Sequence, residues 1–154
     1  MSEHDEQKTF FDWVRLNRQY AKNELLRKAM KLCYAVPNGS KFEKVRNKKG
    51  QLWSPTGKKM KEEGLEKGMP DINLDWATPL NLNKLSKGWW PSLRIEMKFG
   101  KNKLTKEQRE KKDLLEQAGF RVVVAYSAKE AIKAVVDYLP FKESEYQGLE
   151  EFLR

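Results

Sequence analysis

Cysteine and histidine are nearly absent from this chain of 154 residues. The single cysteine, Cys33, cannot form a disulfide within the chain, which fits a reducing compartment, and we expect it to be a buried free thiol. The single histidine, His4, lies in a polar N-terminal stretch. Zinc sites built from clusters of histidine and cysteine are therefore excluded, and so are nucleases that use a histidine base.

Long apolar runs are missing as well. No segment is apolar over the length that crosses a bilayer, and no signal-peptide pattern is present. We therefore expect a cytoplasmic protein, in a bacterium or in a phage-infected host, with no membrane partner.

Positive charge is abundant instead. The formal net charge is +9 and the pI is about 9.5. Residues 41–67 hold nine Lys and Arg against four Glu, and residues 84–112 hold ten against three. Such a surface is typical of a protein that binds a polyanion, and a solvated basic face is the alternative. Residues 140–154 are acidic.

Two acids and a lysine stand in apolar runs that predict strands. Glu96 and Lys98 alternate within residues 92–99, so they share one face of a strand. Asp71 opens a second predicted strand, residues 71–76. Carboxylates and a lysine on adjacent strands suit metal-dependent phosphodiester hydrolysis. Because Glu-x-Lys occurs three times in this lysine-rich chain, a surface Glu/Lys pair is the alternative.

The first helix is predicted to begin at Thr9, after a frayed segment of residues 1–8, and its apolar stripe extends to Leu32. Glu24 falls at the edge of that stripe, where it could face a pocket. The alternative is a solvated Glu24 paired with Lys28 at i,i+4.

The rest of the pattern predicts an α/β fold with a mixed central β-sheet flanked by helices on both faces. The expected strands are a short one at 34–37, two at 71–76 and 92–99 that pair antiparallel, and a buried one at 121–126. The expected helices are at 55–66, at 106–118, where Thr105 and Gln108 form a capping-box pattern, and in a last segment that ends before Pro140. A basic loop at 41–53 and a loop at 77–91 connect them.

This order resembles the restriction-endonuclease-like αβββαβ core of the PD-(D/E)xK nuclease superfamily. It is more closely similar to the virus-type replication-repair nuclease (VRR-NUC) family, through Gly68-Met69-Pro70-Asp71, Ile95-Glu96-Met97-Lys98 and Leu104-Thr105-x-x-Gln108. The resemblance covers residues about 20–139. It implies a single nuclease domain over residues 1–154, with a core at about 9–139 and an acidic C-terminal extension at 140–154.

Carried over to this chain, the resemblance implies that Asp71, Glu96 and Glu24 bind Mg²⁺ or Mn²⁺ together with the main-chain carbonyl of Met97. Lys98 would orient or polarise the attacking water, and Gln108 would help to position the site. Candidate nucleic-acid-binding lysines are Lys58, Lys59, Lys101 and Lys103. Three tryptophans, Trp53, Trp89 and Trp90, could stack on unpaired bases, with a core or dimer contact as the alternative for each.

The expected function is that of a divalent-metal-dependent endodeoxyribonuclease. Members of this family that stand alone look like homodimers that cut branched DNA, so we expect selectivity for four-way (Holliday) junctions. A nuclease for flaps or nicks is one alternative, and a non-catalytic nucleic-acid-binding module on the same fold is another. Clustered acids in a basic cleft argue against the pure binder, which gains nothing from them.

Overall fold

A four-stranded mixed sheet forms the centre of the molecule in the computed structural model, which describes residues 1–37, 44–80 and 88–154. Its strands lie in the order β1 (Cys33–Ala35), β4 (Ile72–Leu74), β7 (Leu93–Met97) and β8 (Arg121–Ala125). Strand β4 is antiparallel to both β1 and β7, and β8 is parallel to β7. The predicted mixed sheet is confirmed.

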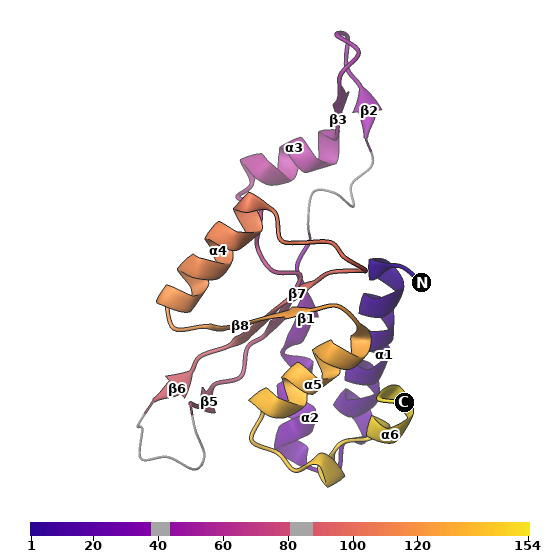
Figure 1. Ribbon diagram of the computed structural model, residues 1–154, viewed down its shortest axis with the longest axis vertical. Coiled ribbons are helices and arrows are strands. Elements are labelled where there is room, and N and C mark those ends of the chain that lie inside the picture. Colours follow the sequence, from indigo (N-terminus) through magenta and orange to yellow (C-terminus); the bar gives the residue numbers. More distant parts are fainter. Residues whose placement is uncertain (38–43, 81–87) are drawn as a thin grey trace.

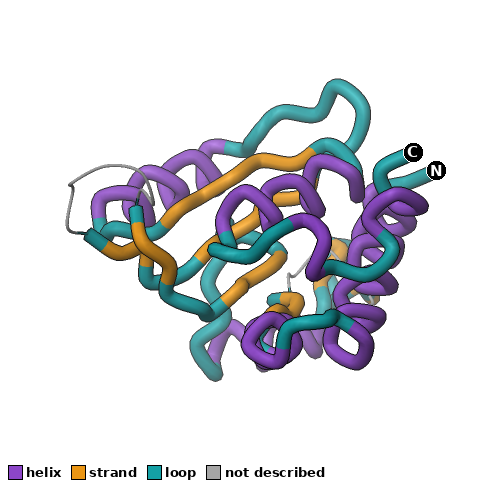
Figure 2. The backbone as a smooth tube through the Cα atoms, turned by 90° about the horizontal axis from the view of Figure 1, so that it is seen from below, coloured by secondary structure: helices purple, strands orange, loops and turns teal. Residues whose placement is uncertain are grey.

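Helices lie on both sides of this sheet (Figures 1 and 2). On one side are α1 (Glu3–Tyr20), α2 (Glu24–Lys31) and α5 (Ala128–Tyr138), and on the other is α4 (Lys106–Gln117). The remaining elements are β2 (Val45–Arg46), β3 (Leu52–Trp53), α3 (Pro55–Glu62), β5 (Thr78–Pro79), β6 (Trp89–Trp90), the 3₁₀ turn η2 (Glu143–Glu145) and α6 (Leu149–Phe152).

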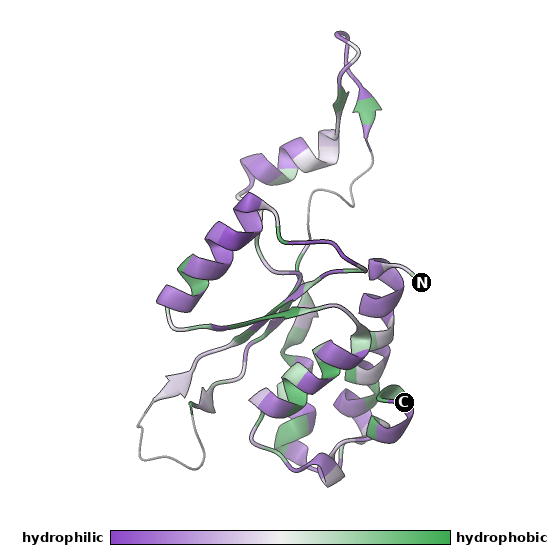
Figure 3. Ribbon diagram, in the orientation of Figure 1, coloured by the Kyte–Doolittle hydropathy of each residue, from purple (hydrophilic) through white to green (hydrophobic). Residues whose placement is uncertain are grey.

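Strand β7 divides its side chains between two different environments. Leu93, Ile95 and Met97 are fully buried in the hydrophobic core that α1, α2 and α5 complete. Because side chains alternate along a strand, Glu96 points to the opposite face, toward α4. Figure 3 shows the contrast: green residues mark the sheet and α5, whereas α3 and α4 are largely hydrophilic. The polar face of the sheet is therefore available for a site.

The N-terminal prediction was wrong in two respects. Helix α1 begins at Glu3 and not at Thr9, because Ser2 and Asp5 form a capping box: the Asp5 amide donates to Ser2 Oγ at 3.2 Å and the Ser2 amide donates to Asp5 Oδ2 at 2.8 Å. The helical stripe is also broken at residues 21–23, where Asn23 caps a separate helix, α2. The second helix can therefore point its side chains independently of the first.

Two segments predicted as loops contain hairpins. In the basic segment 41–53, β2 pairs with β3; residues 41–43 lie outside the described residues. In the segment 77–91, β5 pairs with β6; residues 81–87 also lie outside the described residues. Helix α3 ends at Glu62, four residues before the expected end. Strand β8, predicted to be buried, is an edge strand with Arg121 exposed.

The C-terminal residues pack against α1. The ring of Tyr146 stacks on that of Trp13 with a centroid distance of 5.7 Å. Asn17 holds the backbone of Gln147 with two hydrogen bonds: its side-chain amide donates to the carbonyl at 3.1 Å, and its Oδ1 accepts from the amide at 2.8 Å. No helix in the described ranges is both long and apolar enough to span a membrane.

Candidate active site

A cleft of about 830 Å³ opens where β4 and β7 approach the N-terminal end of α4, and α3 and the β2–β3 hairpin form its far wall. Asp71, Glu96, Lys98 and Gln108 all line it. These are the residues that sequence reasoning placed on two adjacent strands and at the start of the following helix. The structure therefore brings four of the five expected catalytic residues together.

Asp71 is held in the cleft by the neighbouring strand. It directly precedes β4, and its side chain is only 3% exposed. Its Oδ2 accepts a hydrogen bond from the backbone amide of Met97 at 2.8 Å. The bond fixes one carboxylate oxygen against the end of β7, beside Glu96.

Glu96 is positioned by a helix cap. Gln108 is the third residue of α4, and its Oε1 accepts from the backbone amide of the capping residue Thr105 at 2.9 Å. This leaves the other end of the amide, Nε2, to donate to Glu96 Oε1 at 2.9 Å. The predicted capping box is confirmed, and the local signal that begins α4 also orients a side chain in the cleft.

Burial and the neighbouring carboxylate together perturb the pKa of Glu96. Burial, followed by the charge of Asp71 and a hydrogen bond with it, raises the pKa of Glu96 from 4.5 to about 9. The nearby ammonium of Lys98 opposes this rise. Burial and a like charge both disfavour the ionised form. At neutral pH, Glu96 is therefore protonated in the protein alone, and a cation in the cleft would favour its ionisation.

Lys98 follows β7 and shares the face of Glu96, as strand alternation predicted. Its side chain is 8% exposed, and its backbone amide donates to the carbonyl of Ala125 at 2.8 Å. Because Lys98 lines the cleft and its charge lowers the pKa of Glu96, its ammonium lies near the paired acids. The alternative of a solvated surface Glu/Lys pair is wrong.

The expected placement of Glu24 in the cleft is wrong. Its side chain is 72% exposed and pairs with Lys28 at 3.5 Å, which was the alternative. The separate cap at Asn23 turns α2 so that this acid faces solvent. The helix-borne acid of the cleft is Glu3, in the first turn of α1, and its charge also raises the pKa of Glu96. The Ser2/Asp5 capping box could have identified that helix start.

The predicted nucleic-acid-binding lysines are divided between two regions. Lys58 lines the cleft, whereas Lys59, Lys101 and Lys103 are exposed residues outside its lining. Sequence reasoning missed three further lysines of the cleft wall, which are Lys44, Lys61 and Lys67. Their position depends on how α3 and the β2–β3 hairpin fold, and charge density alone does not show it.

The donor set of the cleft suits a hard divalent cation. Within the described ranges, no three Asp, Glu, His or Cys side chains are gathered closely enough to hold a metal by themselves. Two adjacent carboxylates are nonetheless a common arrangement for Mg²⁺, which keeps several of its waters. The raised pKa of Glu96 marks a pair of acids whose repulsion a bound cation would relieve.

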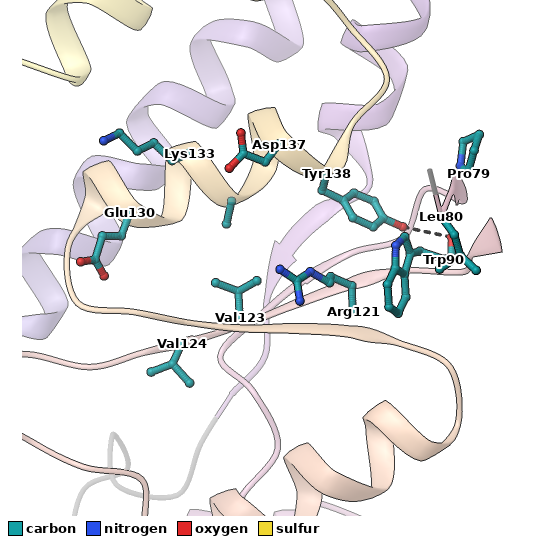
Figure 4. A pocket seen from close by; sticks show the side chains of 11 residues that line it. Pro79, Leu80, Trp90, Arg121, Val123, Val124, Glu130, Lys133, Asp137 and Tyr138 are labelled. Carbon is teal, nitrogen blue, oxygen red and sulfur yellow. Dashed lines mark hydrogen bonds between the residues drawn. The ribbon is translucent and has the colours of Figure 1, made fainter. Parts of the chain in front are cut away.

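A second cavity, of about 550 Å³, lies between α5, β8 and the β5–β6 hairpin (Figure 4). Arg121, Lys133 and Asp137 line it, so its charges are mixed. The hydroxyl of Tyr138 donates to the backbone carbonyl of Trp90 at 3.1 Å, which closes one end. The paired acids lie in the other cleft, so this cavity has no chemistry of that kind.

Comparisons with known proteins agree with the fold. A model of the VRR-NUC domain family matches residues 5–129. A solved structure described as a VRR_NUC domain protein is similar over 96% of this chain and 97% of that chain, with a TM-score of 0.62 and 22% sequence identity. At that identity the structural similarity shows the fold alone. No curated protein matches the chain.

Proposed function

Since the chain belongs to the VRR-NUC family of nuclease domains, we propose that it is a divalent-metal-dependent endonuclease that hydrolyses phosphodiester bonds in branched DNA. The observation that carries this proposal is the buried pair Asp71 and Glu96 with Lys98 beside it in a basic cleft. Two acids placed together at a cost in stability have no value to a protein that only binds a polyanion.

Asp71 and Glu96 would hold the metal ion, together with the main-chain carbonyl of Met97. Bound there, Mg²⁺ or Mn²⁺ would polarise the scissile phosphate and lower the pKa of the attacking water. Asp71 is already oriented by the Met97 amide, and Glu96 by the Gln108 amide. Both carboxylates therefore need little reorganisation to act as ligands, which favours binding. Glu24, exposed and paired with Lys28, is not part of this proposal.

Lys98 would place its positive charge beside the attacking water and the phosphate. An ammonium held by burial in a fixed position stabilises the charge that develops on the phosphate oxygens, and it needs no solvent reorganisation to do so. Gln108 acts as a positioning residue through its bond to Glu96. Lysines on the cleft wall would neutralise backbone phosphates on either side of the reacting one.

Selectivity for four-way junctions and action as a homodimer are the finer parts of the proposal. In the described part of each chain one cleft contains the paired acids, whereas resolution of a junction requires two symmetric cuts. Two subunits related by a two-fold axis would supply them. We place this activity in the cytoplasm of a bacterium or of a phage-infected host.

A cleavage panel tests the proposed function. End-labelled four-way junction, flap, nicked duplex, intact duplex and single strand would be incubated with Mg²⁺, with Mn²⁺ and with excess EDTA. The proposal predicts metal-dependent cuts, symmetric in the junction. If cuts are confined to the flap or the nicked duplex, those DNA structures and not the four-way junction are the substrate. Binding without cleavage of any member would refute the enzyme and leave a binding module.

A further inference from the structure

A basic arm projects from the body of the molecule beside the candidate active site. We define the arm as residues 44–62, which comprise β2, β3 and α3. The two strands pair antiparallel, with Val45 opposite Trp53, and α3 begins directly afterwards at Pro55. Figure 1 shows the hairpin standing away from the sheet and the other helices.

Residues 66–68, which follow the arm, pack on the helix that carries Gln108. Gly68, which follows the arm, has a φ of +87° and packs so closely on α4 that an added Cβ would lie 2.6 Å from the carbonyl carbon of Glu107. Ion pairs reinforce the contact, because Lys111 binds Glu66 at 3.1 Å and Lys67 lies 3.7 Å from Glu107. The segment after the arm and the carboxylate of Glu96 thus both contact the first turn of α4, at Glu107 and Gln108.

The charge of the arm complements a polyanion. Its residues include seven Lys and Arg against a single Glu. Three of these cations, Lys44, Lys58 and Lys61, line the cleft that contains Asp71 and Glu96. A nucleic acid can therefore contact basic side chains on the wall while one phosphate approaches the acids.

Trp53 gives the wall a second kind of contact. It lines the cleft, its side chain is partly exposed at 37%, and its neighbour Leu52 is 62% exposed. Lys58 lies 5.9 Å from the centre of its ring. Neither Trp53 nor Leu52 belongs to the hydrophobic core cluster. An aromatic side chain that the core does not use, in a basic cleft, matches the stacking platforms of proteins that bind unpaired bases.

We propose that the arm grips DNA in the cleft and that Trp53 stacks on a base that has left the duplex next to the phosphodiester being cut. Bases inside a duplex are already stacked on both sides, so only an unpaired base can use the ring. The arm would thereby favour splayed or flapped DNA, or a junction with opened pairs, over intact duplex. This inference rests on the proposed function and specifies the substrate class of that same cleft.

Equilibrium binding of two DNA probes in excess EDTA tests the arm without cleavage. One probe is a splayed duplex with 2-aminopurine at the first unpaired position, and the other is a fully paired duplex of equal length. The variants are Trp53→Ala, Trp53→Phe and, as a matched control, Trp89→Ala. Trp89, the second of the tryptophans expected to stack on bases, lies outside the lining of the cleft; it is 66% exposed on the β5–β6 hairpin, which Figure 1 places far from the arm. Thermal melting confirms that each variant is folded.

Because Trp53→Ala loses one base stack, its affinity for the splayed probe should fall by about tenfold or more. Its affinity for the paired duplex should fall by less than about twofold. Trp53→Phe should retain most of the affinity, and Trp89→Ala all of it. The wild-type protein should quench 2-aminopurine fluorescence, and Trp53→Ala should not.

Three results would overturn the inference: equal losses on both probes, equal losses in Trp89→Ala, or unchanged quenching in Trp53→Ala. These binding readouts are independent of catalysis. If the wild-type protein binds as described but never cleaves with Mg²⁺, the proposed function is contradicted and the role of Trp53 in binding stands. If the protein cleaves normally but Trp53→Ala binds the splayed probe as well as wild type does, the role of Trp53 is contradicted and the proposed function stands.

Discussion

Replacing Glu96 by glutamine should make the metal-free protein more stable at pH 8 while removing its activity. In the folded protein the pKa of Glu96 is raised from 4.5 to about 9, chiefly by burial and then by the charge of Asp71. The folded state therefore retains a proton that the unfolded state releases. Stability from this proton is complete below the unfolded pKa and is lost progressively as the pH rises toward the folded pKa.

The size of the effect follows from the shift. One pKa unit corresponds to about 1.36 kcal/mol, so raising the pH from 5 to 8 costs the wild-type protein up to about 4 kcal/mol at this site. A glutamine can still accept from Gln108 Nε2 and donate to Asp71, and it does not ionise. The two proteins should then be similarly stable at pH 5, and the variant should be the more stable at pH 8.

Urea unfolding in EDTA at both pH values measures the difference, since the midpoint and slope together yield the free energy of unfolding. Mg²⁺ should restore stability at pH 8 to the wild-type protein and far less to Glu96→Gln, because a ligand of the folded state stabilises it by mass action. If the free energy of unfolding depended on pH identically in the two proteins, the raised pKa of Glu96 would be refuted. Glu96 would then ionise as freely in the folded state as in the unfolded one.

Three further predictions concern the supports of the site. Gln108→Glu retains the capping box with Thr105 but loses the donor to Glu96, so it should lose cleavage and keep helix stability. Gln108→Ala loses the cap as well, so its free energy of unfolding in urea should also fall by about 1 kcal/mol. Equal activity of Gln108→Glu and wild type would contradict the positioning role of Gln108. Gly68→Ala should cost more than about 1 kcal/mol beyond the cost of Gly64→Ala, because both have positive φ but only Gly68 packs against Glu107; equal losses would contradict the close approach. Light scattering during size exclusion should give twice the chain mass of 18.1 kDa, and a monomer that remains monomeric on a junction would remove the paired-cut mechanism.

Local patterns in the sequence predicted the centre of the site well. Alternation along residues 92–99 placed Glu96 and Lys98 on one face, and the Thr105 capping box placed Gln108 at the start of α4. Both signals are short-range. Strand alternation follows from backbone geometry, and the capping box follows from hydrogen bonds between residues three apart in the sequence. The pairing of β4 with β7, which brings Asp71 beside Glu96, followed from the order of the elements.

Such local patterns did not predict contacts between segments that are distant in the sequence. Glu3 and Glu24 stand in the first turns of α1 and α2, and the packing of these two helices decides which acid enters the cleft. The arm depends on hairpin pairing between Val45 and Trp53 and on the close approach of Gly68 to α4. A basic segment with glycine and asparagine is equally compatible with an irregular loop.

Cleavage by a Lys98→Met variant tests whether the charge of Lys98 drives metal-dependent hydrolysis, because methionine keeps the buried aliphatic volume and removes the charge. The assay is single-turnover cleavage of a labelled junction with Mg²⁺, compared with wild type and with Lys129→Ala, an exposed lysine on α5. We expect metal-dependent cleavage by wild type and Lys129→Ala. In Lys98→Met the cleavage rate should be lower than in wild type by about 100-fold or more, whereas the affinity for the junction should stay within about twofold of wild type. Wild-type cleavage in excess EDTA, or an unchanged rate in Lys98→Met, would contradict these expectations.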